Sequence, residues 1–367
     1  MHILLSSAYA LPVKGGVQVV CEYLAQMWYE AGHQVTHITS DTDQPEGVVR
    51  PWRRIYLPAW NPVDPYIIPF PLFNPVHLRR VYRKLLTSVD VVNVQGILYH
   101  NNLALVGEAQ HADVPVVLTE YPGIVPYHNP LINWLEARAF DTLGRYTARH
   151  SDYFVYHNQE VEASLRHYFC TDTPSQQIKV GVDTAHFHPV SDDERARLRQ
   201  QWGFDKPTVL FAGRRTPRKG TDWLPLLDHP DFDIVICGAR QTALDSANSR
   251  VLGYVSDAEL LSLYQACDAF LMFTSGRDFP LVGLEAMACG LPVVLFENPA
   301  NREYHSDETA VFVEAHADAI LAGLLDLIGN PQQRQQMARH ARQRAETLFD
   351  WGTISQQYLS IFKQLRI

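Results

Sequence analysis

The sequence predicts an α/β protein with two Rossmann-like domains that face each other across a cleft. Its 367 residues, 46% hydrophobic and 19% charged, suit two domains better than one. Short apolar runs alternate with helical patterns in both halves, as in parallel sheets covered by helices. The chain is polar over residues 178–201, between the two series. We therefore expect a first domain over 1–190, a second over 191–348 and a final helical segment over 349–367.

The first domain begins with a β-α-β pattern. Residues 2–7 are a predicted buried strand, the Gly15-Gly16 turn follows, and apolar residues at helical spacing continue until Gly32. A basic helix is predicted near residues 77–86. The other strands of this domain are predicted at residues 34–39, 91–94, 115–119 and 153–156.

Residues 51–75 interrupt this alternation. They contain seven prolines and six aromatic side chains, so we expect a long loop there rather than a helix or strand.

The second domain repeats the alternation. Ser256 and Glu259 form a capping-box pattern that starts a helix over 257–267. Gly290, with a proline two residues later, ends the helix that contains Glu285. The remaining elements are strands at 208–212, 233–237, 269–273 and 292–296, and two amphipathic helices at 331–348 and 352–365.

Composition excludes several classes of protein. No apolar run reaches the length of a bilayer span, and residues 1–13 lack the basic start of a secretory signal, so we expect a cytoplasmic protein. A net charge of -9 argues against general nucleic-acid binding. The cysteines lack C-x-x-C spacing, which argues against disulfides and zinc and predicts buried thiols at Cys21, Cys170, Cys237, Cys267 and Cys289.

One stretch departs from the acidic average. Between Arg50 and Lys84 lie seven basic residues and one acidic residue, Asp64. Aromatic residues are interspersed with them, a combination that suits a membrane surface with anionic head groups. Two interpretations remain open: peripheral membrane contact, or a solvated loop and helix packed on the first domain.

Two motifs in the second domain carry candidate binding chemistry. The 212–220 segment follows a predicted strand, which places Arg214 and Lys219 at the carboxyl edge of a parallel sheet, where cations suit a diphosphate. The 276–292 segment runs from a loop into a helix whose amino end suits a phosphate. Glu285, one turn into that helix, has apolar and small neighbours and can accept two hydrogen bonds from a ribose diol.

Together with further motifs, these segments resemble the retaining glycosyltransferases of family 4, which have the GT-B fold. The resemblance covers nearly the whole chain. It rests on Gly15-Gly16, residues 32–35, Gly181-Val182-Asp183 with Phe187 and Pro189, Gly213-Arg214 with Lys219-Gly220, residues 252–255, Leu260 with Tyr264, Asp268, Ser275, residues 285–293 and Phe349-Asp350-Trp351.

This resemblance implies a nucleotide-sugar site, mainly on the second domain, in which Gly16 closes over the donor from the first. Arg214 and Lys219 would neutralise the diphosphate and Glu285 would bind the ribose, without a bound metal or other cofactor. The last helix would cross back to the first domain. The expected acceptor is a glycan or a lipid-linked glycoconjugate. The donor-binding residues expected from the resemblance are Gly15, Gly16, Gly213, Arg214, Lys219, Tyr254, Val255, Pro280, Leu281, Val282 and Glu285.

The chain departs from the family pattern around the donor sugar. Arg277, with Asp278 beside it, stands where the family has a first glutamate, and Tyr121 stands where it has a sugar-facing histidine. Pro280 replaces a common glycine and removes an N–H donor. Arg277 could pair with an acidic donor sugar, Asp278 could replace the glutamate, or activity could be weakened. The candidate catalytic residues are therefore Arg214, Lys219, Asp278, Arg277 and Tyr121.

Histidines give weaker signals. His100, His128 and His157 could contact an acceptor or be ordinary polar residues, and no third ligand accompanies the metal-like spacing of His186 and His188. Three functions remain open: sugar transfer, nucleotide-sugar epimerisation or hydrolysis, and a non-catalytic subunit. The motifs around Lys219 and Glu285 favour sugar transfer.

Overall fold

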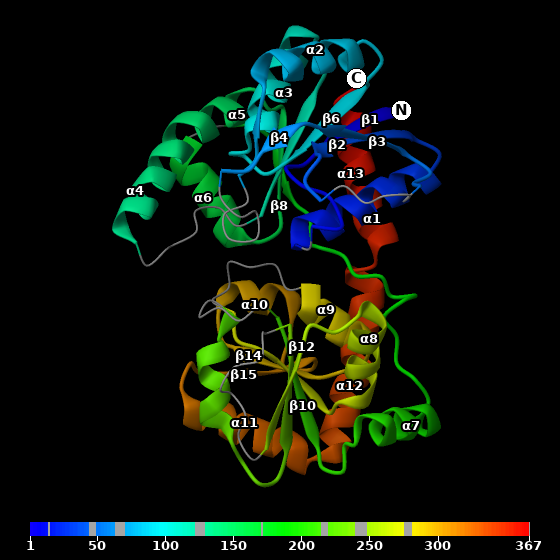
Figure 1. Ribbon diagram of the computed structural model, residues 1–367. Helices are drawn as coiled ribbons and strands as arrows, with labels where there is room; N and C mark the ends of the chain where they lie inside the picture. Colours follow the sequence, from blue (N-terminus) through cyan, green and yellow to red (C-terminus); the bar gives the residue numbers. More distant parts are fainter. Residues whose placement is uncertain are drawn as a thin grey trace. The chain divides into compact units, whose positions relative to one another are not determined.

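The computed structural model describes residues 1–13, 15–43, 49–62, 70–121, 129–169, 172–213, 219–238, 248–274 and 281–366. The chain divides into two compact units, each containing one parallel sheet flanked by helices (Figure 1). The first unit comprises Met1–Val180 and Trp351–Ile367, and the second comprises Gly181–Asp350. The division therefore falls ten residues earlier than the predicted boundary at 190. Residues 181–190 belong to the second unit because their backbone and side chains pack against its helices.

The first unit has a seven-stranded parallel sheet in the order β3-β2-β1-β6-β7-β8-β9. Its strands are β1 (His2–Ser6), β2 (Gln34–Ser40), β3 (Arg53–Leu57), β6 (Val91–Gln95), β7 (Val116–Glu120), β8 (Tyr153–Tyr156) and β9 (Ser175–Gln177). Its helices are α1 (Gly16–Glu30), α2 (Pro75–Leu86), α3 (His100–His111), α4 (Pro130–Ala139), the π-helix η1 (Phe140–Gly144), α5 (Arg145–Arg149), α6 (Gln159–Phe169) and α13 (Trp351–Gln364).

The two faces of this sheet are covered by different helices. Apolar residues of α2, α3, α5 and α6 form one core with the strands. On the other face α13 packs beside α1, where the Trp28 ring meets the rings of Tyr358 and Phe362 at centroid distances of 5.8 and 5.1 Å. The Trp351 ring stacks on Tyr23 at 5.2 Å. The end of the chain is therefore part of the first unit.

The prediction of a long loop over residues 51–75 is wrong for the described part. Strand β3 pairs with β2 at the edge of the sheet, and β4 (Ala59–Trp60) pairs with β5 (Leu72–Phe73) as a short antiparallel ribbon. An edge strand tolerates flanking prolines because only one side of its backbone must bond.

Part of the basic stretch within Arg50–Lys84 packs on the first unit. Arg50 and Arg54 both pair with Glu22 on α1, and Trp52 is buried. In the described part of the stretch, the exposed basic residues are Arg53 on β3 and four residues of α2: Arg79, Arg80, Arg83 and Lys84.

The second unit has a six-stranded parallel sheet in the order β12-β11-β10-β13-β14-β15. Its strands are β10 (Thr208–Ala212), β11 (Asp233–Cys237), β12 (Ser249–Gly253), β13 (Ala269–Met272), β14 (Val293–Phe296) and β15 (Ala310–Val313). Its helices are α7 (Asp192–Trp202), the 3₁₀-helix η3 (Thr221–Leu227), α8 (Asp257–Ala266), α9 (Leu281–Ala288), α10 (Pro299–Tyr304), α11 (Ala317–Gly329) and α12 (Pro331–Leu348).

Most of the predicted elements are confirmed. The strands at 153–156, 208–212 and 233–237 have the predicted bounds, and α8 begins with the predicted capping box. The thiols of Cys21, Cys237, Cys267 and Cys289 are unbridged and buried, whereas Cys170 lies outside the described residues. No helix in the described ranges is long and apolar enough to cross a bilayer.

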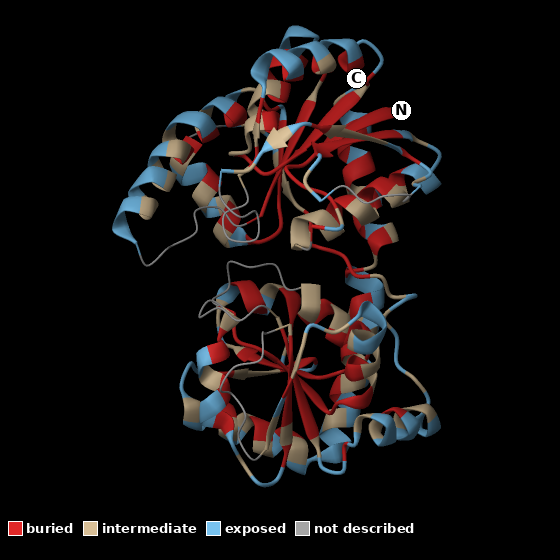
Figure 2. Cartoon of the chain, in the orientation of Figure 1, coloured by how far each residue is buried: buried red, intermediate tan, exposed pale blue. Residues whose placement is uncertain are grey.

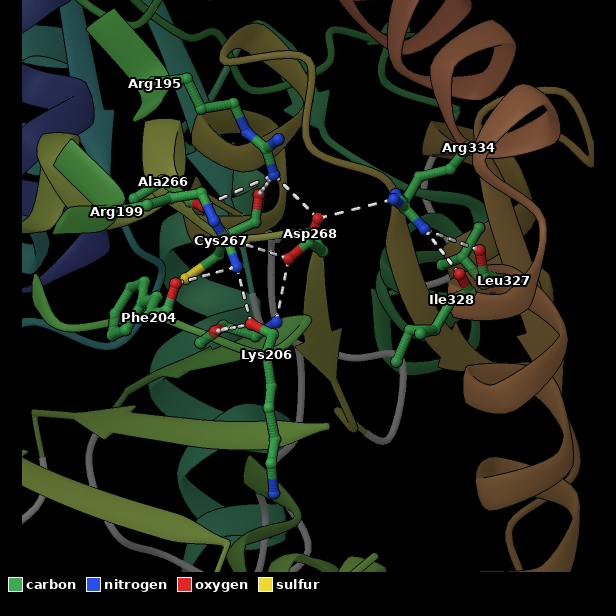
Figure 3. Close-up of polar contacts among 11 residues, drawn as sticks. Arg195, Arg199, Phe204, Lys206, Ala266, Cys267, Asp268, Leu327, Ile328 and Arg334 are labelled. Carbon is green, nitrogen blue, oxygen red and sulfur yellow. Dashed lines mark hydrogen bonds and ion pairs between the residues drawn. The ribbon is translucent and has the colours of Figure 1, made fainter. Parts of the chain in front are cut away.

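A buried carboxylate joins several elements at the amino edge of the second sheet (Figure 3). Asp268 precedes β13 and accepts a hydrogen bond from the Thr208 backbone N–H at 2.9 Å. Its oxygens also lie 2.8 Å from nitrogens of Arg195 and Arg199 on α7, and 3.6 Å from one of Arg334 on α12. Burial would raise the pKa of Asp268, but the Thr208 N–H and the two α7 guanidinium groups lower it overall, below that of an ordinary aspartate.

We expect Asp268→Ala to destabilise the protein by about 3 kcal/mol, because it leaves cations without their buried partner. Because folding lowers the pKa of Asp268, its carboxylate contributes fully to the free energy of unfolding above about pH 4. This contribution is lost as the pH falls further. Urea unfolding of both proteins across this pH range measures the difference. Asp307→Ala is the control, because the Asp307 side chain also pairs with an arginine but is 82% exposed. Equal losses in the two variants would contradict this role.

Candidate functional site

The carboxyl edge of the second sheet is built from closely packed glycines. Gly213 follows β10, Gly238 follows β11, and Gly253 ends β12. The Gly213 N–H donates to the Cys237 carbonyl at 3.1 Å, and the Gly238 N–H donates to the Gly253 carbonyl at 2.7 Å. A Cβ on Gly238, whose φ is +82°, would lie 2.9 Å from the Gly213 oxygen. The strand ends therefore meet without side chains between them, at the edge where open α/β sheets bind ligands.

Lys219 and Gly220 are held at the same edge, ahead of η3. Gly220 has a φ of +73°, and a Cβ there would lie 2.3 Å from the Phe273 Cβ, so no larger residue fits. Phe273 directly follows β13 and is buried. The close approach fixes the backbone that carries Lys219, which is partly exposed. This places one of the predicted diphosphate-binding cations beyond the end of β10.

Glu285 lies on α9 and is held by a tyrosine from the neighbouring helix. The Tyr264 hydroxyl on α8 donates to Glu285 Oε2 at 2.8 Å, and Tyr264 is 1% exposed. Burial raises the pKa of Glu285 to about 7; the Tyr264 hydrogen bond opposes this rise, and the Asp257 charge adds to it. At neutral pH this carboxyl group is therefore divided between its protonated and ionised forms.

Segment 181–190 packs against Tyr264. The Phe187 ring meets the Tyr264 ring at 6.1 Å, edge to face. Arg342 on α12 donates to the carbonyl oxygens of Phe187 at 2.6 Å and of Ala288, the last residue of α9, at 2.7 Å. The Arg342 guanidinium group thus links segment 181–190 to α9, the helix that carries Glu285.

The other predicted donor-binding residues fall into two groups. Leu281 and Val282 form the partly exposed first turn of α9, Val255 is partly exposed, and Tyr254 is 73% exposed. Arg214, Arg277, Asp278 and Pro280 lie outside the described residues. Their roles, like those of the residues above, stay predictions.

In the first unit, Tyr121 directly follows β7 and is buried, with 3% exposure. Its hydroxyl donates to Oε1 of Gln95, the last residue of β6. The ring lies 6.0 Å from the His157 ring, and both side chains line a small pocket with Thr119, Lys179 and Tyr358. Gly15 and Gly16 lie at the amino end of α1, where Gly15 is the N-cap and has an extended backbone.

The candidate histidines have structural partners where they are described. His100 accepts a hydrogen bond from the Phe73 backbone at 3.1 Å, and His157 contacts the Asn158 side chain at 3.0 Å. His128 lies outside the described residues. Within the described ranges, no cluster of three His, Cys, Asp or Glu residues could hold a metal ion. Metal independence stays a prediction.

Sequence reasoning does not find three residues of this arrangement. Tyr264 belongs to the family pattern without an assigned role, and no sequence signal points to Gln95 or Arg342. Their partners are 21, 26 and more than 50 residues away in the chain, so no local pattern joins them.

Two family models match the chain. Residues 14–186 match "Glycosyltransferase Family 4", and residues 194–344 match "Glycosyl transferases group 1". The two matches correspond to most of the first and second units.

Characterised relatives are distant. A Corynebacterium glutamicum GDP-mannose-dependent monoacylated α-(1-6)-phosphatidylinositol monomannoside mannosyltransferase is 25% identical, over 58% of this chain and 62% of that enzyme. Mannosylfructose-phosphate synthase of Agrobacterium fabrum is 28% identical, over 50% and 46%. The chain thus spans about half to two thirds of these two relatives. Phosphatidyl-myo-inositol mannosyltransferase of Mycolicibacterium smegmatis is 27% identical, over 99% and 94%.

Solved structures share the fold over nearly the full chain. Sucrose-phosphate synthase from Thermosynechococcus elongatus has a TM-score of 0.77 at 19% identity, covering 99% of this chain and 98% of that one. The Anabaena protein HepE, solved with UDP and glucose, has a TM-score of 0.75 at 17% identity, covering 98% and 99%. Together, the two parallel-sheet units, the matched family models and these structural neighbours show that the chain belongs to glycosyltransferase family 4, a family of transferase enzymes with the GT-B fold.

Proposed function

We propose that this protein is a retaining glycosyltransferase that moves a sugar from a nucleoside diphosphate to a glycan or lipid-linked acceptor. The observation that carries the proposal is the Glu285 carboxyl group, held by Tyr264 at the glycine-built carboxyl edge of the second sheet. An ionised carboxylate can accept both hydrogen bonds of a ribose diol. Lys219 at the same edge, together with Arg214, supplies positive charge for the diphosphate.

In this proposal the leaving diphosphate is stabilised by side-chain cations and by backbone at the start of α9, around Leu281 and Val282, without a bound metal. Gly15, Gly16, Gly213, Tyr254 and Val255 contribute further donor contacts. Tyr121, oriented by Gln95, and the Arg277-Asp278 pair act at the donor sugar.

The names of two relatives support a lipid-linked acceptor, because both relatives are described as acting on phosphatidylinositol compounds. We extend this acceptor class to the present chain. The exposed basic surface of α2 is a candidate peripheral contact with a membrane that carries such acceptors.

Incubation with a panel of UDP- and GDP-sugars, with and without lipid-linked and soluble glycan acceptors, tests the proposal. We expect nucleotide release that depends on the acceptor and continues in the presence of a metal chelator. NMR of the product should show the anomeric configuration of the donor. Release without an acceptor would indicate hydrolysis, and donor binding without release would indicate a non-catalytic subunit.

Separate alanine variants distinguish the two roles proposed at residues 277 and 278. If Arg277 pairs with an acidic donor sugar, Arg277→Ala removes the preference for a uronic acid donor over a neutral one. If Asp278 replaces the family glutamate, Asp278→Ala lowers kcat with either donor, and the same panel measures both effects.

Tyr264→Phe should weaken nucleotide-sugar binding about tenfold at pH 7. The variant loses a hydrogen bond that holds Glu285 and lowers its pKa, so less carboxylate is ionised at neutral pH. Titration calorimetry between pH 6 and 9 should show the pH dependence displaced upward. Tyr82→Phe, which removes a buried hydroxyl from α2 of the first unit, is the control, and the same loss in both variants would contradict the role of Tyr264.

A further inference from the structure

Helix α4 of the first unit is unusual because none of its residues is buried. Its large apolar side chains are mostly open to solvent: Leu131 is 63% exposed, Trp134 55% and Leu135 53%. In Figure 2 the helix shows exposed and intermediate residues along its length, unlike α3 and α6 of the same unit. A surface helix of a globular domain normally buries an apolar stripe, so the exposure of these three side chains needs an explanation.

The exposed residues follow one stripe along the helical run α4–η1–α5. The spacing of Leu131, Trp134, Leu135, Arg138, Tyr146 and Arg149 keeps them on one side of the run. The Arg138 guanidinium lies over the Trp134 ring, 5.8 Å from its centroid. We call these six residues the α4 stripe.

The charge of this surface is mainly positive. The run 129–149 contains three arginines and two acidic residues. Glu136 is partly buried, and Asp141, whose side chain is 45% exposed, lies 2.6 Å from Arg145. The stripe therefore combines apolar and aromatic side chains with arginines that face solvent.

The neighbouring helices extend the basic surface. Helix α5 packs on α3, which packs on α2, and a Cβ on Gly107 of α3 would lie 2.5 Å from the Tyr146 hydroxyl. The carboxylate of Glu108 on α3 is itself covered by Arg83 of α2, at 2.7 Å. Arg80 and Lys84 of α2 are exposed. Beyond the α4 stripe, α2 thus also exposes basic side chains.

We propose that the α4 stripe docks on an anionic lipid surface, with Leu131, Trp134 and Leu135 entering the head-group region and Arg138 and Arg149 meeting lipid phosphates. Leucine and tryptophan beside arginines that outnumber the acidic residues match the needs of an interfacial helix. The inference rests on the proposed lipid-linked acceptor, but it assigns membrane docking to a surface other than the basic stretch predicted from sequence.

Cosedimentation with vesicles tests this docking. The wild-type protein should bind vesicles of phosphatidylglycerol and phosphatidylcholine, and bind phosphatidylcholine alone much more weakly. Trp134→Ala/Leu135→Ala should lower the partition coefficient at least about tenfold, because two apolar side chains no longer enter the interface. Leu226→Ala is the matched control, since Leu226 is 58% exposed on the second unit.

A second measurement locates the contact. Brominated lipid should quench tryptophan fluorescence in the wild-type protein and much less in Trp134→Phe. Arg138→Gln should weaken binding to the anionic vesicles, whereas Arg197→Gln, at an exposed position of α7, should not. Equal vesicle binding or equal quenching in wild type and variants would overturn the proposal. So would a dimer in sedimentation velocity that is lost in the double variant, because the stripe would then join two copies.

Failure of this inference can be told apart from failure of the proposed function. The double variant keeps every candidate donor-binding residue, so its affinity for a nucleotide sugar should equal that of the wild type. Lost vesicle binding with intact donor binding supports the docking surface. A protein that binds vesicles through the stripe but transfers no sugar would leave the docking surface standing and overturn the proposed enzyme.

Discussion

Glu285→Gln should weaken nucleotide-sugar binding about 100-fold at pH 8 and abolish its pH dependence. In the wild-type protein the pKa of Glu285 is about 7, so the ionised form rises from about one tenth at pH 6 to about nine tenths at pH 8. If the ribose diol is bound by the carboxylate, wild-type affinity should rise about tenfold over this range. Glutamine has no ionised form and loses one accepting oxygen, so its weak affinity should stay constant.

Titration calorimetry with an intact UDP- or GDP-sugar measures this effect. A free nucleoside diphosphate is a poor probe, because a terminal phosphate titrates near pH 6 itself. Glu297→Gln is the control, since Glu297 is exposed and its pKa is lowered by its hydrogen bonds with Arg302. A pH slope that persists in Glu285→Gln would show that another group titrates on binding, and would remove Glu285 from the ribose site.

Gly220→Ala should destabilise the second unit by at least about 3 kcal/mol and abolish donor binding. Two costs combine here: a left-handed φ of +73°, and a new methyl group 2.3 Å from the Phe273 Cβ and 2.8 Å from its carbonyl oxygen. Because Phe273 is fixed beside the sheet, the loop carrying Lys219 must move instead. Thermal and urea unfolding, followed by calorimetry with the nucleotide sugar, measure both effects.

The chain provides a matched control for this strain. Gly203 has a φ of +69°, but no atom lies within 4 Å of the position of an added Cβ. Gly203→Ala therefore incurs only the backbone cost, about 1 kcal/mol, and should leave donor binding unchanged. If the two variants were equally stable, close packing against Phe273 would not be what requires a glycine at position 220.

Much of the fold could be predicted because its signals are local. The strand at 208–212 is a short apolar run, and α8 begins with a capping box within four residues. Strand β3 could not be predicted, because Arg53 and Arg54 join the sheet through the backbone of β2, and Arg54 also pairs with the distant carboxylate of Glu22. Local composition there indicates a loop, and long-range pairing overrides it.

In the candidate site, too, some features follow from local sequence and others from contacts between distant residues. The sequence by itself determined that Lys219 and Glu285 follow strands of a parallel sheet, because the apolar runs and the motifs that follow them are local features of the chain. Only the tertiary structure decided that Tyr264 holds Glu285 and that Gly220 must remain glycine. It also decided that the apolar residues of α4 face solvent instead of a core. These facts depend on which surfaces meet in three dimensions, and hydrophobic spacing along the chain carries no information about the partner.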